Sequence, residues 1–169
     1  MLLAGPVQAD VHAAAHAASA TDARQSKVVA AKESPAKRAA VNSIDRHAAD
    51  LTDLSDRIWA YAEIALREHK SAAALADYAE QQGFTVERGV AGMPTAFIAT
   101  YGSGRPVIGV MGEYDALPGV SQKASPIQEP LLEGAAGHGC GHNMFGAASL
   151  GAAIAIKEQI AAGKLTGTV

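Results

Sequence analysis

The densest group of reactive side chains lies in the stretch Gly137–Asn143. It holds His138, Cys140 (the only cysteine of the chain) and His142 at alternate positions, separated by glycines. In an extended segment, side chains two residues apart point the same way, so these three are expected to face one point. A thiolate and neutral imidazoles are preferred ligands of zinc and similar divalent metals. The spacing therefore predicts a metal site.

This stretch comes directly before an apolar run that starts at Met144 and is typical of a buried helix. At a helix N-terminus, the unpaired amide groups and the helix dipole favour a thiolate over a thiol. Two other interpretations of Cys140 remain open. A lone cysteine is often a small buried hydrophobic residue. It can also be a nucleophile, if a base lies elsewhere in the fold.

Two carboxylates, Glu113 and Asp115, follow the apolar run Val107–Met111, which is typical of a strand buried on both faces. Open α/β sheets bind ligands outside the carboxyl ends of such strands. The simpler alternative is that Asp115 only forms a turn before Pro118. The long irregular loop 118–136 favours a functional role, because it leads from these carboxylates to Cys140.

Helical periodicity predicts three helices that position these residues. The first is expected to begin at Asn42 or Ser43, and the second to cover Lys70–Gln82 and to end at Gly83 in a left-handed cap. The third covers His142–Ala162. The first helix presents an apolar stripe, and the second turns three residues inward; the members are Ile44, Leu51, Leu54, Ile58 and Tyr61, then Leu75, Tyr78 and Ala79.

Strands are expected at 85–88, 95–101 and 107–111, and another begins near Leu165. The fold class is therefore α/β, a mixed sheet with flanking helices. Residues 1–41 bury too little apolar surface to fold and are expected to be a leader or disordered tail, whereas 42–169 form the folded part. The end of 1–9 resembles a clipped export signal, which favours an exported over a cytoplasmic protein.

The charge balance excludes some partners. The formal net charge is -3 and basic residues do not form a large cluster, so nucleic-acid binding is not indicated. No apolar run is long enough and free enough of charge to span a membrane. A single cysteine cannot form an internal disulfide.

Two motifs, Gly112–Gly119 and Gly137–Asn143, occur here in a characteristic order and separation. They resemble those of the metal-dependent amidohydrolases, which include aminoacylases, carboxypeptidases and indole-acetyl-amino-acid hydrolases. The resemblance is closest to the branch that contains p-aminobenzoyl-glutamate hydrolase and covers about residues 43–169. It implies hydrolysis of an amide bond in an N-acyl amino acid or dipeptide-like small molecule.

The resemblance also implies roles for individual residues. Cys140 and His142 would bind manganese or zinc, in a complete site that holds two metals. Asp115 would support the site from outside the metal shell by orienting a ligand. His138 is not generally a ligand in this family, which weakens the three-ligand geometry above.

Two positions depart from the family pattern. Glu113 stands where many relatives have histidine or aspartate, and Asn143 stands where many have aspartate. Like His138, both are expected to line the site.

Members of this family are much longer. Beyond the strand that begins near Leu165 they carry a Glu-Glu pair, which provides the general base and a metal ligand, and then a lid or dimerisation domain. The resemblance thus implies a partial catalytic domain, an N-terminal fragment that is inactive alone, and a homo- or hetero-oligomer at full length. The alternatives are a non-catalytic binding module and a cysteine-dependent hydrolase.

Overall fold

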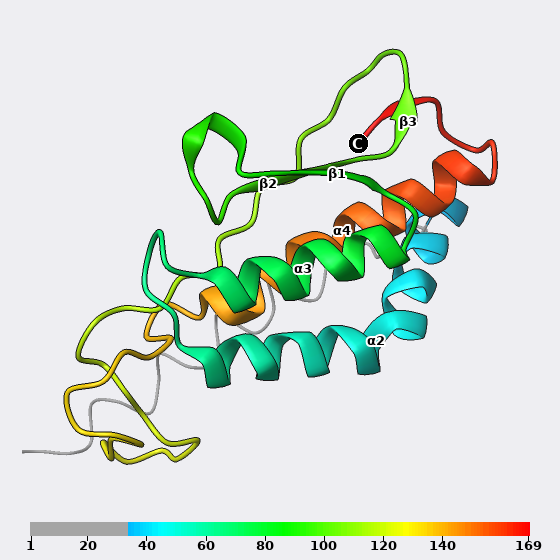
Figure 1. The fold of residues 1–169 in the computed structure, drawn as a ribbon. Helices are drawn as coiled ribbons and strands as arrows, with labels where there is room; N and C mark the ends of the chain where they lie inside the picture. The colour runs from blue at the N-terminus through cyan, green and yellow to red at the C-terminus, as the bar shows by residue number, and fades with distance from the viewer. Residues whose placement is uncertain (1–33) are drawn as a thin grey trace, which may run out of the picture. The chain divides into compact units, whose positions relative to one another are not determined.

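The computed structural model describes residues 34–169, which form an α/β arrangement of three long helices and four short strands (Figure 1). The expected export signal lies outside the described residues. In chain order the elements are α2 (Pro35–Tyr61), α3 (His69–Gln81), β1 (Thr85–Arg88), the short 3-10 helix η1 (Val90–Gly92), β2 (Phe97–Thr100), β3 (Gly102–Ser103), α4 (His142–Ala161) and β4 (Gly167–Thr168).

Helix α2 begins at Pro35, so the predicted start at Asn42 or Ser43 is wrong. Proline suits a first helical position because its missing N–H would have no partner there. The alanines and basic residues that follow are good helix formers. Ser43 lies inside the helix and is fully buried. The expected tail is therefore helical from Pro35 onward.

Helix α3 was predicted within one residue at each end. Its N-terminus is held by Glu63, whose carboxylate accepts hydrogen bonds from the backbone N–H of Lys70 (3.0 Å) and Ser71 (2.9 Å) and from the Ser71 hydroxyl. At the other end Gly83 adopts a φ of +88°, and the N–H of Phe84 donates to the carbonyl of Ala79. This is the expected left-handed cap.

The core forms where the three helices meet. Leu54 and Ile58 of α2 are 1% and 0% exposed, which confirms the centre of the predicted stripe, although Ile44 at its start is 38% exposed. Leu75, Tyr78 and Ala79 of α3 are buried as predicted, and Leu150 and Ile154 of α4 pack against them. In Figure 1, α3 and α4 lie between α2 and the strands β1 and β2.

The strands form two small antiparallel sheets, not one mixed sheet. β1 pairs with β2, with Thr85 opposite Thr100, and β3 pairs with β4, with Gly102 opposite Thr168. Within residues 34–169, parallel pairing is limited to single bridges, Ile64 with Ala116 and Val107 with Thr168.

The prediction that Val107–Met111 is a strand buried on both faces is wrong. The segment belongs to neither sheet, and Val107 and Met111 are 67% and 75% exposed. Burial of a strand depends on neighbouring strands and covering helices, and residues 34–169 provide a helix on one side only. In this described part of the chain, none of the helices has the length and apolar character needed to cross a membrane.

Candidate active site

The candidate site is centred on His142, the first residue of α4. Its Nδ1 lies 2.8 Å from Oδ1 of Asp115, and its Nε2 lies 3.1 Å from Oε2 of Glu113. The histidine and Asp115 are about a quarter exposed, and Glu113 is half exposed. The structure thus brings together three of the predicted site residues from segments far apart in sequence.

These contacts constrain the protons of the imidazole. An ionised carboxylate only accepts hydrogen bonds, and a neutral imidazole has only one N–H. Both contacts are therefore satisfied only when both ring nitrogens carry a proton, or when another cation replaces the proton at one of them. The group has the composition of a histidine ligand supported by a carboxylate.

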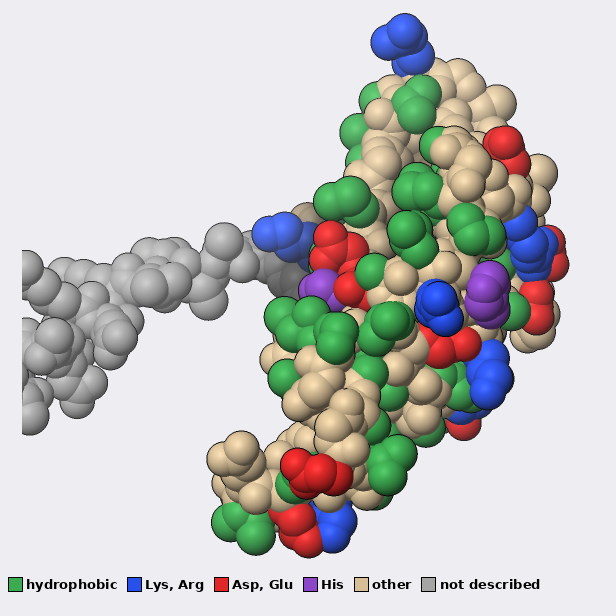
Figure 2. Space-filling view, turned by 60° about the vertical axis from the view of Figure 1, so that its left-hand side comes forward, with side chains coloured by type: hydrophobic (Ala, Val, Ile, Leu, Met, Phe, Trp, Pro, Cys, Tyr) green, Lys and Arg blue, Asp and Glu red, His purple; other side chains and the backbone are tan. Residues whose placement is uncertain are grey.

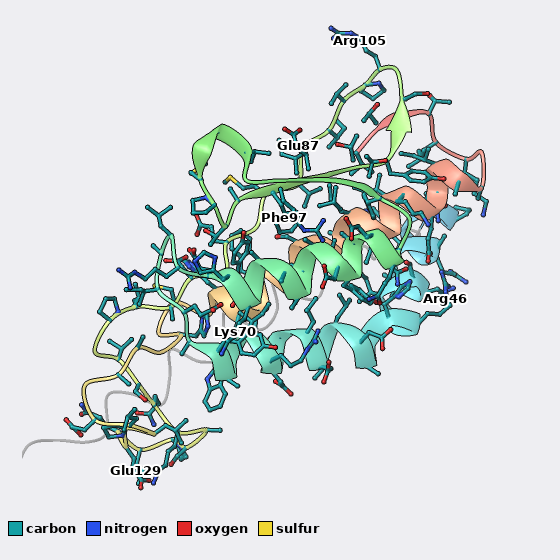
Figure 3. All side chains as sticks on the ribbon, in the orientation of Figure 1. Arg46, Lys70, Glu87, Phe97, Arg105 and Glu129 are labelled. Atoms are coloured by element: carbon teal, nitrogen blue, oxygen red, sulfur yellow. The ribbon has the colours of Figure 1, made fainter. Side chains whose placement is uncertain are left out.

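The segment carrying Glu113 and Asp115 is held from its opposite side by Tyr114. The Tyr114 hydroxyl donates to the backbone carbonyl of Thr95, and its ring stacks on Phe97 with centroids 6.2 Å apart (Phe97 is labelled in Figure 3). Burial, with a smaller contribution from the charge of Glu68, raises the pKa of Tyr114 to about 12. Because alternate side chains of an extended segment point to opposite sides, this anchor leaves both carboxylates free to face His142.

The motif Gly137–Asn143 is not extended. The N–H of Gly141 donates to the carbonyl of His138 (3.1 Å), which closes a turn, and Gly141 has a φ of +74° that favours glycine. The expectation that His138, Cys140 and His142 face one point rested on an extended backbone and is wrong.

His138 and Asn143 turn toward α2. Nε2 of His138 lies 3.0 Å from the carbonyl of Ile58, and burial lowers its pKa. Asn143 is 7% exposed, and its amide donates to the hydroxyl of Ser55 (3.1 Å). Both side chains therefore attach the site segment to α2. Asn143 does not cap α4, since no side-chain hydrogen bond caps that helix.

Cys140 is exposed at the turn and makes no hydrogen bond to any residue in 34–169. Among the same residues, no three His, Cys, Asp or Glu side chains are arranged to hold a metal ion between them. The donor types around His142 are nevertheless those that divalent metals bind: an imidazole, a nearby thiol and carboxylates.

The loop 118–136 leaves and returns at one point beside the site. Leu117 and Gly137 exchange two backbone hydrogen bonds (2.9 and 3.0 Å), which joins the Asp115 segment to the His138 segment. Inside the loop, the amide of Gln122 donates to the carbonyl of Ile127 (2.7 Å) and accepts from the N–H of Glu129 (3.1 Å). Figure 3 shows Glu129 at the end of the loop farthest from the strands. The loop is thus ordered by its own contacts.

Sequence reasoning missed the residues that support the site. Glu63, Glu68, Thr95 and Tyr114 were not singled out, although the Thr95 hydroxyl donates to buried Glu68 (2.7 Å). The only available signal was the position of Tyr114 between two carboxylates. Its partner Thr95 is set by the fold and not by a local pattern.

The chain is similar in sequence to known proteins. The chain is 48% identical over 119 residues to one subunit of the p-aminobenzoyl-glutamate hydrolase of Escherichia coli (strain K12), a match that covers 70% of the chain and 25% of the relative. It is 32% identical over 139 residues to the Xaa-Arg dipeptidase of Mus musculus, covering 75% and 28%, and 29% identical over 130 residues to that of Homo sapiens, covering 69% and 26%. No family model matches the chain.

The chain therefore belongs to the amidohydrolase-type family suggested by its two motifs, whose relatives are hydrolases and peptidases. Within it, the chain is more similar to the p-aminobenzoyl-glutamate hydrolase subunit than to the two dipeptidases. It spans about a quarter of the length of these curated relatives.

Proposed function

We propose that this protein takes part in metal-dependent hydrolysis of an amide bond in an N-acyl amino acid or a dipeptide-like substrate. The relatives named above are a hydrolase of p-aminobenzoyl-glutamate, an acyl-amino acid, and dipeptidases. The observation that carries the proposal is the 2.8 Å contact between Asp115 and Nδ1 of His142. A carboxylate in this position fixes the tautomer of a histidine and directs its other nitrogen at a metal.

His142 and Cys140 are the proposed ligands of a manganese or zinc ion. A divalent metal of this kind supplies Lewis-acid polarisation of an amide carbonyl and activates water near neutral pH. Asp115 holds the proton at Nδ1 and so keeps Nε2 available for the metal. Glu113 lies 3.1 Å from Nε2 and provides a negative charge there. A complete site of two metals is proposed on the resemblance alone.

The 169-residue chain by itself is proposed to have little hydrolytic activity. In the described part of the chain, the two carboxylates nearest His142 both contact its ring, so neither is placed as a separate general base. We further propose that the active form is an oligomer, because the bacterial relative is named as a subunit. Cysteine-dependent hydrolysis has less support, because no histidine lies within hydrogen-bonding distance of Cys140 among residues 34–169.

The test is titration of the purified chain with Mn²⁺ or Zn²⁺, followed by calorimetry and by metal analysis after gel filtration. Binding is expected to weaken by about tenfold or more in Cys140→Ser and His142→Ala. His69→Ala, which removes an exposed histidine at the start of α3, is the matched control and is expected to bind like wild type. Equal binding by all four proteins would refute the proposed ligands.

Hydrolysis of p-aminobenzoyl-glutamate and of an Xaa-Arg dipeptide is measured in parallel. Negligible turnover with and without metal is expected. Substantial turnover that is lost in Cys140→Ser but survives a chelator would instead indicate a cysteine nucleophile.

A further inference from the structure

We infer that Glu63 is a positioning residue for the candidate site: it holds the connection between α2 and α3 in a strained conformation that aligns Asp115 with His142. Its effect on metal binding rests on the proposed function. Its effect on the contact between Asp115 and His142 does not, because that contact involves protein atoms alone.

The carboxylate of Glu63 caps α3 from outside the helix. Its oxygens accept hydrogen bonds from the N–H of Lys70 (3.0 and 3.1 Å), the N–H of Ser71 (2.9 Å) and the Ser71 hydroxyl (2.9 Å); Lys70 is labelled in Figure 3. Ser71 is fully buried, so these bonds lie at the edge of the core. Glu68, which occupies the usual capping position, makes no side-chain bond to the helix. Glu63 takes over the capping, and the connection must fold back to allow it.

The connection is strained on both sides of Glu63. Ala62 has a φ of +45° and Leu66 a φ of +63°, in the left-handed region that residues with a Cβ rarely adopt. The N–H of Arg67 donates to the carbonyl of Ile64 (3.0 Å), which closes a turn whose third residue is Leu66. A turn with positive φ at that position usually has glycine or asparagine there. Such conformations persist where neighbouring contacts hold them, and Glu63 supplies contacts between the two strained residues.

The backbone of the same residue holds the segment that carries Asp115. The carbonyl of Glu63 accepts from the N–H of Ala116 at 2.7 Å, and Ile64 forms a parallel bridge with Ala116. Ala116 is only 2% exposed, so it is enclosed by its neighbours. Asp115 precedes it directly, and its Oδ1 lies 2.8 Å from Nδ1 of His142. A displacement of the Glu63 backbone would therefore be passed to the contact between Asp115 and His142.

Two further contacts attach the site to the same connection. The carbonyl of Ile58, at the end of α2, lies 3.0 Å from Nε2 of His138. Glu68 is 8% exposed and accepts from the hydroxyl of Thr95 (2.7 Å), the residue whose carbonyl binds Tyr114. In Figure 1 the connection between α2 and α3 lies at the same end of the helices as the start of α4. Both motifs of the site are thus anchored at this connection.

The simpler alternative is that Glu63 only stabilises α3. A cap alone would lower the stability of the fold when it is removed and would leave the site of the folded molecules unaltered. A positioning role predicts that Asp115 and His142 lose their alignment in molecules that remain folded. It also predicts that glycine at Leu66, which adopts a positive φ at low cost, makes the site less dependent on Glu63.

The experiment compares Glu63→Ala and Glu63→Gln in the 169-residue protein, at a temperature at which circular dichroism shows the variants to be folded. Glutamine keeps one acceptor oxygen, so it is expected to have the smaller effect and to remain folded if the alanine variant does not. Ala73→Gly is the matched control. It weakens α3 at an exposed position through helix propensity and touches none of the contacts of Glu63.

Proton NMR gives a measure of alignment that needs no metal. The Nδ1–H of His142 is expected to exchange slowly with water in wild type and in Ala73→Gly, because Asp115 accepts from it. Exchange is expected to be about 2–30-fold faster in Glu63→Ala, and to return toward the wild-type rate when Leu66→Gly is added. A rapidly exchanging Nδ1–H in wild type, or equal exchange in wild type and both Glu63 variants, would overturn the inference.

Metal affinity is the second measure. Figure 2 shows acidic and histidine side chains next to one another on the molecular surface, and His142 and Asp115 are about a quarter exposed, so added metal can reach them. Calorimetric titration with Mn²⁺ or Zn²⁺ is expected to show about 2–30-fold weaker binding by Glu63→Ala, a smaller loss for Glu63→Gln and none for Ala73→Gly.

The two measures separate the inference from the proposed function. Absence of metal binding by wild type would refute the proposed function, and the proton exchange would still decide the role of Glu63. Equal loss of metal affinity in Glu63→Ala and Ala73→Gly would show that weakening of α3 is the cause and would overturn the inference. The same holds if Leu66→Gly restores neither the slow exchange nor the affinity of Glu63→Ala.

Discussion

The hydroxyl of Tyr114 is hydrogen-bonded to the backbone carbonyl of Thr95, and this contact lies on the opposite side of the segment from Asp115 and Glu113. The residue that secures the two carboxylates is thus their immediate neighbour in sequence. Stability of the fold and placement of the candidate site are coupled at this one side chain.

Tyr114→Phe is expected to lower the free energy of unfolding by about 1–3 kcal/mol, because the Thr95 carbonyl loses its partner while the stacking on Phe97 is retained. Denaturant unfolding measures the change. Tyr61→Phe, at the end of α2, is the control for loss of a tyrosine hydroxyl. An unfolding curve like that of wild type would show that the hydroxyl contributes nothing.

Asp115→Asn is expected to weaken binding of Mn²⁺ or Zn²⁺ by about 10–100-fold, since the amide can donate to Nδ1 and so stabilise the wrong tautomer of His142. Calorimetric titration gives the ratio. Glu129→Gln neutralises a carboxylate on the distant loop and so changes the net charge by the same amount. This control variant should bind the metal like the wild-type protein. If both variants lose affinity equally, net charge and not the histidine contact is responsible.

Glu158 links α4 to α2 through His47 (3.1 Å) and Arg46 (2.5 Å). Burial raises its pKa, but the Ser43 hydroxyl, His47 and Arg46 together outweigh burial and bring the pKa below 4.5. A carboxyl group whose pKa is lower in the folded state stabilises the fold above its unfolded pKa. The free energy of unfolding is therefore expected to fall as the pH drops from 4.5 through the pKa of Glu158 in the folded protein.

Thermal unfolding at a series of pH values tests this expectation. Glu158→Gln should have a shallower loss of stability below pH 4.5 than the unaltered protein. Glu87→Gln, on β1, leaves the network intact and should follow the wild-type curve. If the stability of wild type and of Glu158→Gln fell equally with pH, Glu158 would not be the group responsible for the loss.

Gly137→Ala is expected to destabilise the protein by about 1–3 kcal/mol, because the added Cβ would lie 2.5 Å from the carbonyl oxygen of Val120. The loop would have to move at the point where it joins the site. Gly109→Ala is the matched control, since a Cβ there meets nothing within 4 Å. Chemical denaturation of both variants should separate them, and equal stability would show that the loop adapts freely.

The local elements were largely predictable from sequence. β1 has the predicted bounds, α3 differs from prediction by one residue at each end and α4 by one residue at its C-terminus, because periodicity and the glycine caps act over short distances. The start of α2 at Pro35 was not predicted. The chain around Pro35 has little apolar periodicity to mark it.

Properties that depend on distant segments were not predictable. Val107–Met111 has the composition of a buried strand, but its exposure depends on which strands lie beside it. At the site, Asp115 and Glu113 both contact His142, and all three lie in the two motifs that the sequence marks. The sequence could not show that a turn at Gly141 directs His138 toward Ile58, because that orientation depends on the packing of α2.

The paired backbone bonds between Leu117 and Gly137 close the base of the intervening loop. These bonds hold the two ends of the loop together independently of the residues inside it. A change of length or composition inside the loop can therefore leave the two carboxylates and His142 in place.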